Sequence, residues 1–247
     1  VEVTKAAEVY TDCLTFTGES SEFTLAVGSS GAKEWDGTLY YSTDHNTWNV
    51  WDGTAVSSAN KKLYLRGKNN TKFTTSKGAR LSLSAKAGCS GNIQTLLDYE
   101  NPPTSIPVEN CYNGMFFNST NLITAPDLPA TTLVKSCYQY MFSGCTSLTI
   151  APALPATILA EDCYYNMFSS CANLTTAPEL PATTLASGCY LSMFDGCTKL
   201  KVNTSSGNKI FTCPATIPNG ATSFMFSSTG GAFTGTPTAG NTYYWTE

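Results

Sequence analysis

A repeat of 26 residues constrains the fold of this chain more than any other feature. The dipeptide Cys-Tyr begins at residues 111, 137, 163 and 189, and Met-Phe starts four residues after each of these cysteines. A second cysteine follows at 145, 171 and 197, with Ser119 in its place in the first copy. A unit this short cannot bury its apolar residues alone, so neighbouring copies must stack into one continuous core. The sequence therefore predicts a solenoid.

Each unit is expected to have two sides. The first three copies continue as Ala-Pro-x-Leu-Pro-Ala-Thr, over residues 125–131, 151–157 and 177–183. The prolines exclude helix and favour an extended segment that ends in a fixed corner. The Cys-Tyr-x-x-Met-Phe segment has the i, i+4, i+5 apolar spacing that is typical of a helical turn. We therefore expect one extended side and one side made of short helical turns.

The ends of such an array need caps. We expect the N-terminal cap to begin near Asn92, with three apolar residues, Ile93, Leu96 and Leu97. Residues 223–226 read as a last, degenerate copy, 32 residues after the copy that contains Met193. Residues 243–245, Tyr-Tyr-Trp, are expected to form a strand that covers the open end.

The first part of the chain has a different pattern. Short apolar runs, several of them alternating, separated by turn residues, occur at 22–27, 38–41, 63–66 and 81–83. Such runs are typical of a β-sandwich. We predict an immunoglobulin-like β-sandwich of six or seven strands over 1–88 and a leucine-rich-repeat solenoid with N-terminal and C-terminal caps over 89–247. The fold class is then mainly β with short helical turns.

One predicted hairpin in this part, residues 41–48, places Asp44 and Asn46 at a tight turn before Trp48. Asx side chains hydrogen-bond backbone amides in such turns and tolerate the left-handed conformation. The segment resembles the Asp-box hairpin of β-propeller glycosidases. It is one residue shorter than that motif and occurs once, whereas a propeller repeats its blade. A stable turn is therefore the favoured interpretation.

The repeat unit Cys-Tyr-x-x-Met-Phe-x-x-Cys-x-x-Leu-x-x-Ala-Pro-x-Leu-Pro-Ala-Thr resembles the BspA-like leucine-rich repeats of bacterial surface proteins. The resemblance covers residues 89 to about 230, and the preceding part is similar to the β-sandwich fused to such repeats in gut bacteria and their phages. It implies a secreted, cell-surface or virion protein that adheres to host molecules, other bacteria or glycans. The first ten residues lack the layout of a signal peptide, so an exported protein would have lost its signal.

Ten cysteines invite a disulfide interpretation, and the repeat argues against it. Column neighbours in a stack lie roughly 4.8 Å apart with parallel side chains, whereas a disulfide needs converging Cβ atoms about 3.8 Å apart. Free cysteine also packs well as a small apolar residue. We expect buried thiols in the repeats and leave Cys13, Cys89 and Cys213 open. The Cys-x7-Cys spacing without a nearby histidine excludes a zinc site.

Charge and motifs exclude several function classes. The net charge is −4, and only Lys135 and Lys199 are basic between 101 and 200, so a nucleic-acid partner lacks electrostatic support. No apolar run reaches the roughly 18–20 residues of a membrane span. The single histidine, His45, has no catalytic motif around it. Asp127 and Glu179 share a column roughly 10 Å apart, on a ladder expected to lack a pocket. We predict a non-enzyme without cofactor or metal.

Binding is the better hypothesis, and the variable repeat positions are its candidates. One column holds Gly114 and three candidate ligand-binding residues, Tyr140, Asn166 and Ser192. A column beside the strand holds three more, Thr124, Ile150 and Thr176, and ends at Val202. The alternative is that these positions merely face solvent. The repeat tyrosines, and the tryptophans at 35, 48 and 51, could stack on sugars, but core and turn-support roles are more common.

Two functions follow. The first is a monomeric recognition protein that binds a glycan or a host or bacterial surface protein through the repeats. The alternative is a structural display or spacer protein of a bacterial surface or phage particle, with no ligand of its own. An exposed aromatic patch favours the first function, and a uniformly small, Ser/Thr-covered face favours the second.

Overall fold

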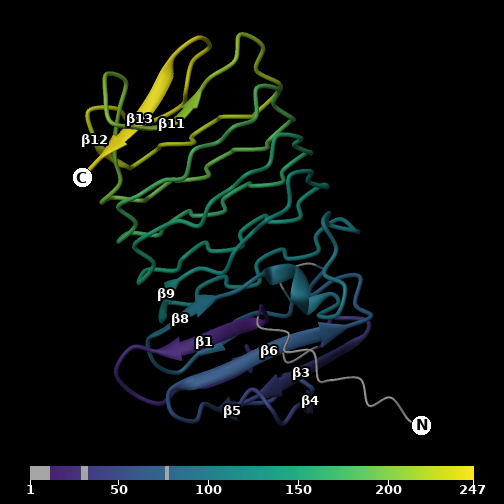
Figure 1. Ribbon diagram of the computed structural model, residues 1–247. Coiled ribbons are helices and arrows are strands. Elements are labelled where there is room, and N and C mark those ends of the chain that lie inside the picture. The colour runs from purple at the N-terminus through teal and green to yellow at the C-terminus, as the bar shows by residue number, and fades with distance from the viewer. Residues whose placement is uncertain (1–11, 29–32, 76–77) are drawn as a thin grey trace.

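The structure is a computed structural model that describes residues 12–28, 33–75 and 78–247. Within these ranges the chain is mainly β, with several sheets and almost no helix, as predicted. The strands of the first part lie at one end, the repeats are stacked above them, and strands β11, β12 and β13 lie at the far end (Figure 1). The predicted first domain, 1–88, includes residues 1–11, 29–32 and 76–77, which lie outside the described ranges.

Two sheets make up the first part. The predicted runs correspond to strands β2, β3, β6 and β7, and Phe16, Leu63 and Leu65 of one sheet share a core with Leu25 and Leu83 of the other. The six-stranded sheet has the order β4-β3-β6-β1-β8-β9, with bounds Asn49–Trp51, Thr38–Ser42, Lys62–Lys68, Leu14–Gly18, Ala87–Ser90 and Leu122–Thr124. The three-stranded sheet has the order β5-β2-β7, with bounds Val56–Ser57, Thr24–Val27 and Leu81–Leu83.

The hairpin between β3 and β4 has the predicted Asx turn. Asp44 accepts hydrogen bonds from the backbone N–H groups of Asn46 (2.9 Å) and Thr47 (2.7 Å). These bonds lower the pKa of the Asp44 carboxyl, because they stabilise its charged form. His45 at the tip has a left-handed backbone, with φ of 64°. The turn prediction is confirmed.

The Cys-Tyr-x-x-Met-Phe segments, called the turn side below, do not form the predicted helical turn. Their backbone N–H groups alternate between two acceptors: Met115 donates to Tyr112 O within its own copy (3.2 Å), whereas Phe116 donates to Met141 O in the next copy (2.9 Å). Every fourth residue has positive φ, as at Asn110, Gly114 and Asn118. A period of four buries the i, i+4, i+5 positions as a helix does, so the apolar spacing alone could not separate the two structures.

The turn side also supplies two columns of stacked rings. Tyr112, Tyr138, Tyr164 and Tyr190 follow one another with ring centroids 5.8, 5.9 and 6.0 Å apart. Phe116, Phe142, Phe168, Phe194 and Phe226 stack at 5.5, 5.6, 5.5 and 5.8 Å. Both columns are buried, so like side chains stack through the core as the repeat predicts.

All ten cysteines are buried, as expected for the repeats and now found for Cys13, Cys89 and Cys213 as well. The second column has a specific partner: the Cys145 thiol donates to Phe116 O and the Cys171 thiol to Phe142 O, both at 3.0 Å. Ser119 replaces cysteine in the first copy, and its hydroxyl donates to Leu81 O in the same way. The column therefore requires a small side chain that can donate a hydrogen bond.

The Leu-x-x-Ala-Pro-x-Leu-Pro segments form the extended side. This side has two short strands, β9 in the first copy and β10 (Lys201–Asn203) after the third. Between β9 and β10, the copies are joined by isolated parallel bridges, including the one between Ile150 and Thr176. Prolines lack the N–H that a continuous ladder needs. Two buried leucines per copy, such as Leu148 and Leu154, hold each segment against the core.

The N-terminal end of the repeats is closed by the first part of the chain. Phe73 and Thr74 both donate backbone hydrogen bonds to Cys111 O (3.0 Å each), and Leu81 donates to Met115 O (2.7 Å). The predicted cap residues Ile93, Leu96 and Leu97 are buried, in or next to the 3-10 helix η1 (Ile93–Leu96). They are therefore only part of the closure, and the predicted boundary at 88/89 falls inside β8.

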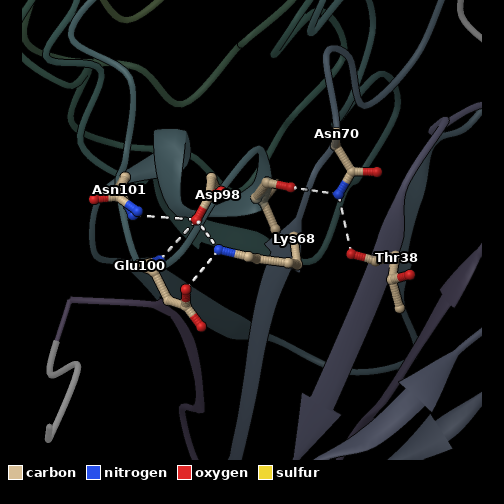
Figure 2. Close-up of polar contacts among 7 residues, drawn as sticks. Thr38, Lys68, Asn70, Asp98, Glu100 and Asn101 are labelled. Atoms are coloured by element: carbon tan, nitrogen blue, oxygen red, sulfur yellow. Dashed lines mark hydrogen bonds and ion pairs between the residues drawn. The ribbon is translucent and has the colours of Figure 1, made fainter.

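Polar side chains fix η1 to the six-stranded sheet. Lys68 on β6 reaches Asp98 (3.1 Å) and Glu100 (2.6 Å), just after η1 (Figure 2). Asn70 donates through its side-chain amide to Thr38 O (3.0 Å) and Leu96 O (2.9 Å). This network connects β3, β6 and η1 in one unit.

The C-terminal end has the predicted last copy and covering strand. Phe194 donates to Met225 O (2.9 Å), which continues the ladder into residues 223–226. Strand β13 (Thr242–Thr246) contains Tyr243, Tyr244 and Trp245. It lies in a four-stranded sheet of order β11-β13-β10-β12, in which β11 is Asn208–Thr212 and β12 is Gly230–Gly231.

Candidate ligand-binding groove

The six predicted ligand-binding residues lie on two different sides of the repeats. Tyr140, Asn166 and Ser192 are half-buried on the turn side, whereas Thr124, Ile150 and Thr176 belong to the extended side. The first three have φ of 57°, 53° and 51°. Their column is therefore restricted by a left-handed backbone, which favours glycine and asparagine. Its variation is not free drift.

The Tyr140 ring packs against two neighbouring aromatic rings. Its ring lies 6.1 Å from Phe117 and 5.0 Å from Tyr165, centroid to centroid. Burial, together with a hydrogen bond to Tyr165, raises the pKa of the Tyr140 hydroxyl to about 12. These contacts make Tyr140 a packing residue on a partly exposed aromatic stripe.

A groove of about 550 Å³ lies on the extended side. Residues of the Ala-Pro-x-Leu-Pro segments in two successive copies line it, from 150–155 and 176–181, together with Trp245 of β13. We call it the proline groove. Ile150 is 59% exposed and pairs with Thr176 across the two copies. The structure thus brings two predicted residues together, while Thr124 lies apart on β9, where its hydroxyl donates to Cys89 O (3.2 Å).

A second hollow, of about 650 Å³, shares Trp245 and Thr176 with the proline groove. We call it the lysine pocket. Unlike the groove, it has lysines in its lining, and Trp245 lines both hollows. Its remaining lining residues are Thr175, Thr198, Lys199, Lys201, Gly230, Gly231, Thr246 and Glu247.

Strand alternation places Trp245. Tyr243, two residues earlier on β13, points into the core and is fully buried. Side chains two apart share a face of a strand, so Trp245 lies on the same face, where it packs against the edge of the core and remains half-buried. Pairing with Val202 on β10 and Asn208 on β11 fixes its backbone on both sides.

Trp245 differs from the other tryptophans in its contacts with rings and cations. Trp35 stacks on Trp51 with centroids 5.8 Å apart, and the Arg66 guanidinium lies 3.8 Å from the Trp48 ring centroid. Among the described residues, no aromatic ring or cation stacks on Trp245. The tryptophans at 35, 48 and 51 thus serve the core and the turn, and the repeat tyrosines are buried.

The two hollows differ in whether the lysines beside them form ion pairs. Lys209 reaches Glu179 at the rim of the proline groove (3.2 Å), and Lys135 reaches Glu161 (2.9 Å). Within the described part of the chain, Lys199 and Lys201 have no ion-pair partner. The Thr176 hydroxyl oxygen is buried without a hydrogen-bond partner, a state that costs about 1–3 kcal/mol.

The residues that were considered for catalysis, Asp127, Glu179 and His45, lie in different parts of the structure. Glu179 lies in the proline groove, whereas Asp127 bridges to Asn92 beside η1. The His45 Nε2 atom lies 3.4 Å from the Cys13 thiol, a contact that the sequence did not predict. Burial raises the pKa of Cys13 to about 11, which keeps the thiol protonated and opposes its use as a nucleophile.

No cluster of three or more His, Cys, Asp or Glu side chains suited to a metal ion occurs among residues 12–28, 33–75 and 78–247. The helices of this same part are all too short or too polar to cross a membrane.

Sequence reasoning missed the position of Trp245 and of the two lysines beside these hollows. Trp245 was assigned only to a covering strand, although alternation with Tyr243 is visible in the sequence. Trp245 of β13 meets residues 150–155 and 176–181, which lie 64 to 95 residues earlier in the chain, and no local pattern signals this meeting.

Comparisons with protein-family models, with curated proteins and with solved structures give no match for this chain.

Proposed function

We propose that this protein is a non-catalytic recognition protein that binds glycans on the extended side of its repeats. The proposal includes a leucine-rich-type solenoid related to the BspA-like repeats, an N-terminal β-sandwich, and export to a cell surface or virion. The ladder between copies supports the solenoid, since residues 25 apart, such as Tyr112 and Cys137, are hydrogen-bonded from copy to copy.

The observation that carries the binding function is the position of Trp245, which is half-buried, lines both hollows and has no stacking partner among the described residues. Sugar rings have an apolar face and a hydroxylated rim. An aromatic plane bordered by apolar residues accommodates the first. The exposed hydroxyls of Thr175 and Thr198, which donate to Thr149 O and Ala172 O, can accept hydrogen bonds from the second. Ile150 and Pro178 extend the apolar surface beside the indole.

The test is a broad glycan array, probed with the wild-type protein and four variants: Trp245→Ala, Trp245→Phe, Asn166→Gly and Tyr140→Ala. Trp245→Ala should lose specific binding, while Trp245→Phe, which keeps an aromatic plane, should retain part of it. Asn166→Gly on the turn side is the matched control and should bind as the wild type does. Circular dichroism on each variant checks that the fold is intact.

Two results would contradict this assignment. Binding that survives Trp245→Ala but is lost in Tyr140→Ala would move the site to the turn side. A blank array for the wild type would favour the alternative of a structural spacer. One observation favours that alternative: a continuous core runs from Leu14 on β1 to Tyr243 on β13, as a stiff rod requires.

A further inference from the structure

The two hollows beside Trp245 differ in the charged side chains that line them. On the proline-groove side, the lining is alanine, proline, leucine, isoleucine and Thr176, with Glu179 paired at the rim with Lys209. On the lysine-pocket side, Lys199 and Lys201 line the hollow with four threonines and the glycines of β12. A ligand that touches both sides therefore meets mainly apolar side chains in one hollow and two lysines in the other.

The two lysines alternate with buried residues along the chain. Leu200 and Val202 are fully buried, whereas Lys199, in the turn before β10, and Lys201, on β10, are exposed and line the same hollow. Glu247 is the one acidic residue that lines the same pocket. The charged side chains that line the pocket are thus two lysines and one glutamate, in a chain whose net charge is −4.

We infer that the glycan bound at Trp245 is acidic, with a carboxylate or sulfate directed to Lys199 and Lys201. The inference rests on the proposed function and narrows it to a ligand class. The apolar face of the sugar would lie on the indole, its hydroxyls would meet the threonines, and its anionic group would enter the lysine pocket. Hydrogen bonds to charged groups are roughly twice as strong as neutral ones, so the anion would dominate selectivity.

An acidic peptide is a poorer match for the same surface. Extended peptides bind sheets by pairing their backbone with a free strand edge. The proline groove has Pro155, Pro178 and Pro181 in its lining, and these residues offer no N–H. The edge strand β12 is only two residues long. A sugar, which does not bind by pairing a peptide backbone with a strand edge, therefore fits this surface better.

The experiment compares matched pairs of sugars by calorimetry at low and high salt: sialyllactose with lactose, and oligogalacturonate with oligogalactose. The wild type should bind the acidic member about ten-fold tighter at low salt, a preference that salt weakens. The double variant Lys199→Gln/Lys201→Gln should lose the preference, and Glu247→Gln should strengthen it. The control Lys62→Gln/Lys135→Gln removes the same charge elsewhere and should keep the preference.

The outcomes separate the two proposals. If Trp245→Ala abolishes binding of both members of a pair while the Lys199/Lys201 variant has no effect, the glycan site stands and the acidic ligand is wrong. If the wild type binds neither member of any pair on this panel or on the array, the proposed function itself is wrong. Binding of poly-glutamate peptides through Trp245, without binding of acidic sugars, would overturn the ligand class.

Discussion

The two sides of each repeat are built by different means. On the turn side, every second N–H of residues 110–118 bonds the next copy, and the rings of four tyrosines and five phenylalanines stack beneath. On the extended side, prolines interrupt pairing and only isolated bridges, such as Ile150 to Thr176, join the copies between β9 and β10. The copies are therefore joined more regularly on the turn side, and the extended side has the proline groove.

Raising the pH above about 9 should destabilise the turn side, and this should be the largest of the expected losses in the free energy of unfolding. Burial raises the pKa of the seven thiols in the two cysteine columns, to about 12 for Cys137 and Cys171. Their protonated form is favoured by folding, so stability is full below the unfolded-state pKa, near 9, and falls as the pH rises above it. Each thiol would remove about 1.4 kcal/mol per pH unit, so seven would exceed a typical total stability within about one to two units.

The measurement is the urea midpoint between pH 7 and pH 11. A midpoint that falls steeply above pH 9 agrees with buried thiols. An unchanged midpoint at pH 11, or fewer than ten titratable thiols in denaturant, would contradict them.

Truncation of one ring should show the same asymmetry between the sides. Phe142 stacks between Phe116 and Phe168, so Phe142→Ala should lower the free energy of unfolding by about 3–5 kcal/mol. Ile150→Ala on the extended side removes an exposed side chain and should cost under about 0.5 kcal/mol. Equal losses in denaturant unfolding would show that both sides carry the core equally.

The tyrosine column allows a sharper test, because its hydroxyls differ. The Tyr112 hydroxyl donates to Gln94 Oε1 (2.7 Å), whereas the Tyr138 hydroxyl is buried without a partner. Tyr112→Phe should cost about 1–2 kcal/mol, since it leaves Gln94 unpaired, and Tyr138→Phe should be neutral or stabilising. A comparable loss for Tyr138→Phe would reveal a buried water bound to its hydroxyl.

The left-handed column should give an effect no larger than that of Tyr112→Phe. Asn166 has φ of 53°, a conformation that a β-branched residue strongly disfavours. Asn166→Val should cost about 1–2 kcal/mol, whereas Asn166→Gly should change stability by under about 0.5 kcal/mol. Thermal unfolding of these two variants tests the prediction. If Asn166→Val is as stable as the wild type, the backbone at residue 166 is not restricted to the left-handed conformation.

Sequence reasoning succeeded where one residue type recurs at a fixed distance. The buried thiols, the stacked rings, the last copy at 223–226 and the strand at 243–245 all follow from the period. It failed on the local backbone of the turn side, because a period of four and a helical turn bury the same positions. It also placed the N-terminal closure at Asn92 alone, since nothing in residues 71–83 marks them as partners of Cys111 and Met115.

The sequence by itself determined that the copies stack, because units with identical apolar positions bury them only against one another. It also determined the mainly β character, through prolines and short alternating runs. Only the tertiary structure decided where a ligand-sized groove lies. Trp245, Thr176 and Lys201 come from different segments, and the hydrogen bonds between β10 and β13 bring Trp245 beside the repeats. A local pattern reports burial, whereas an open groove depends on which distant segment comes to rest beside it.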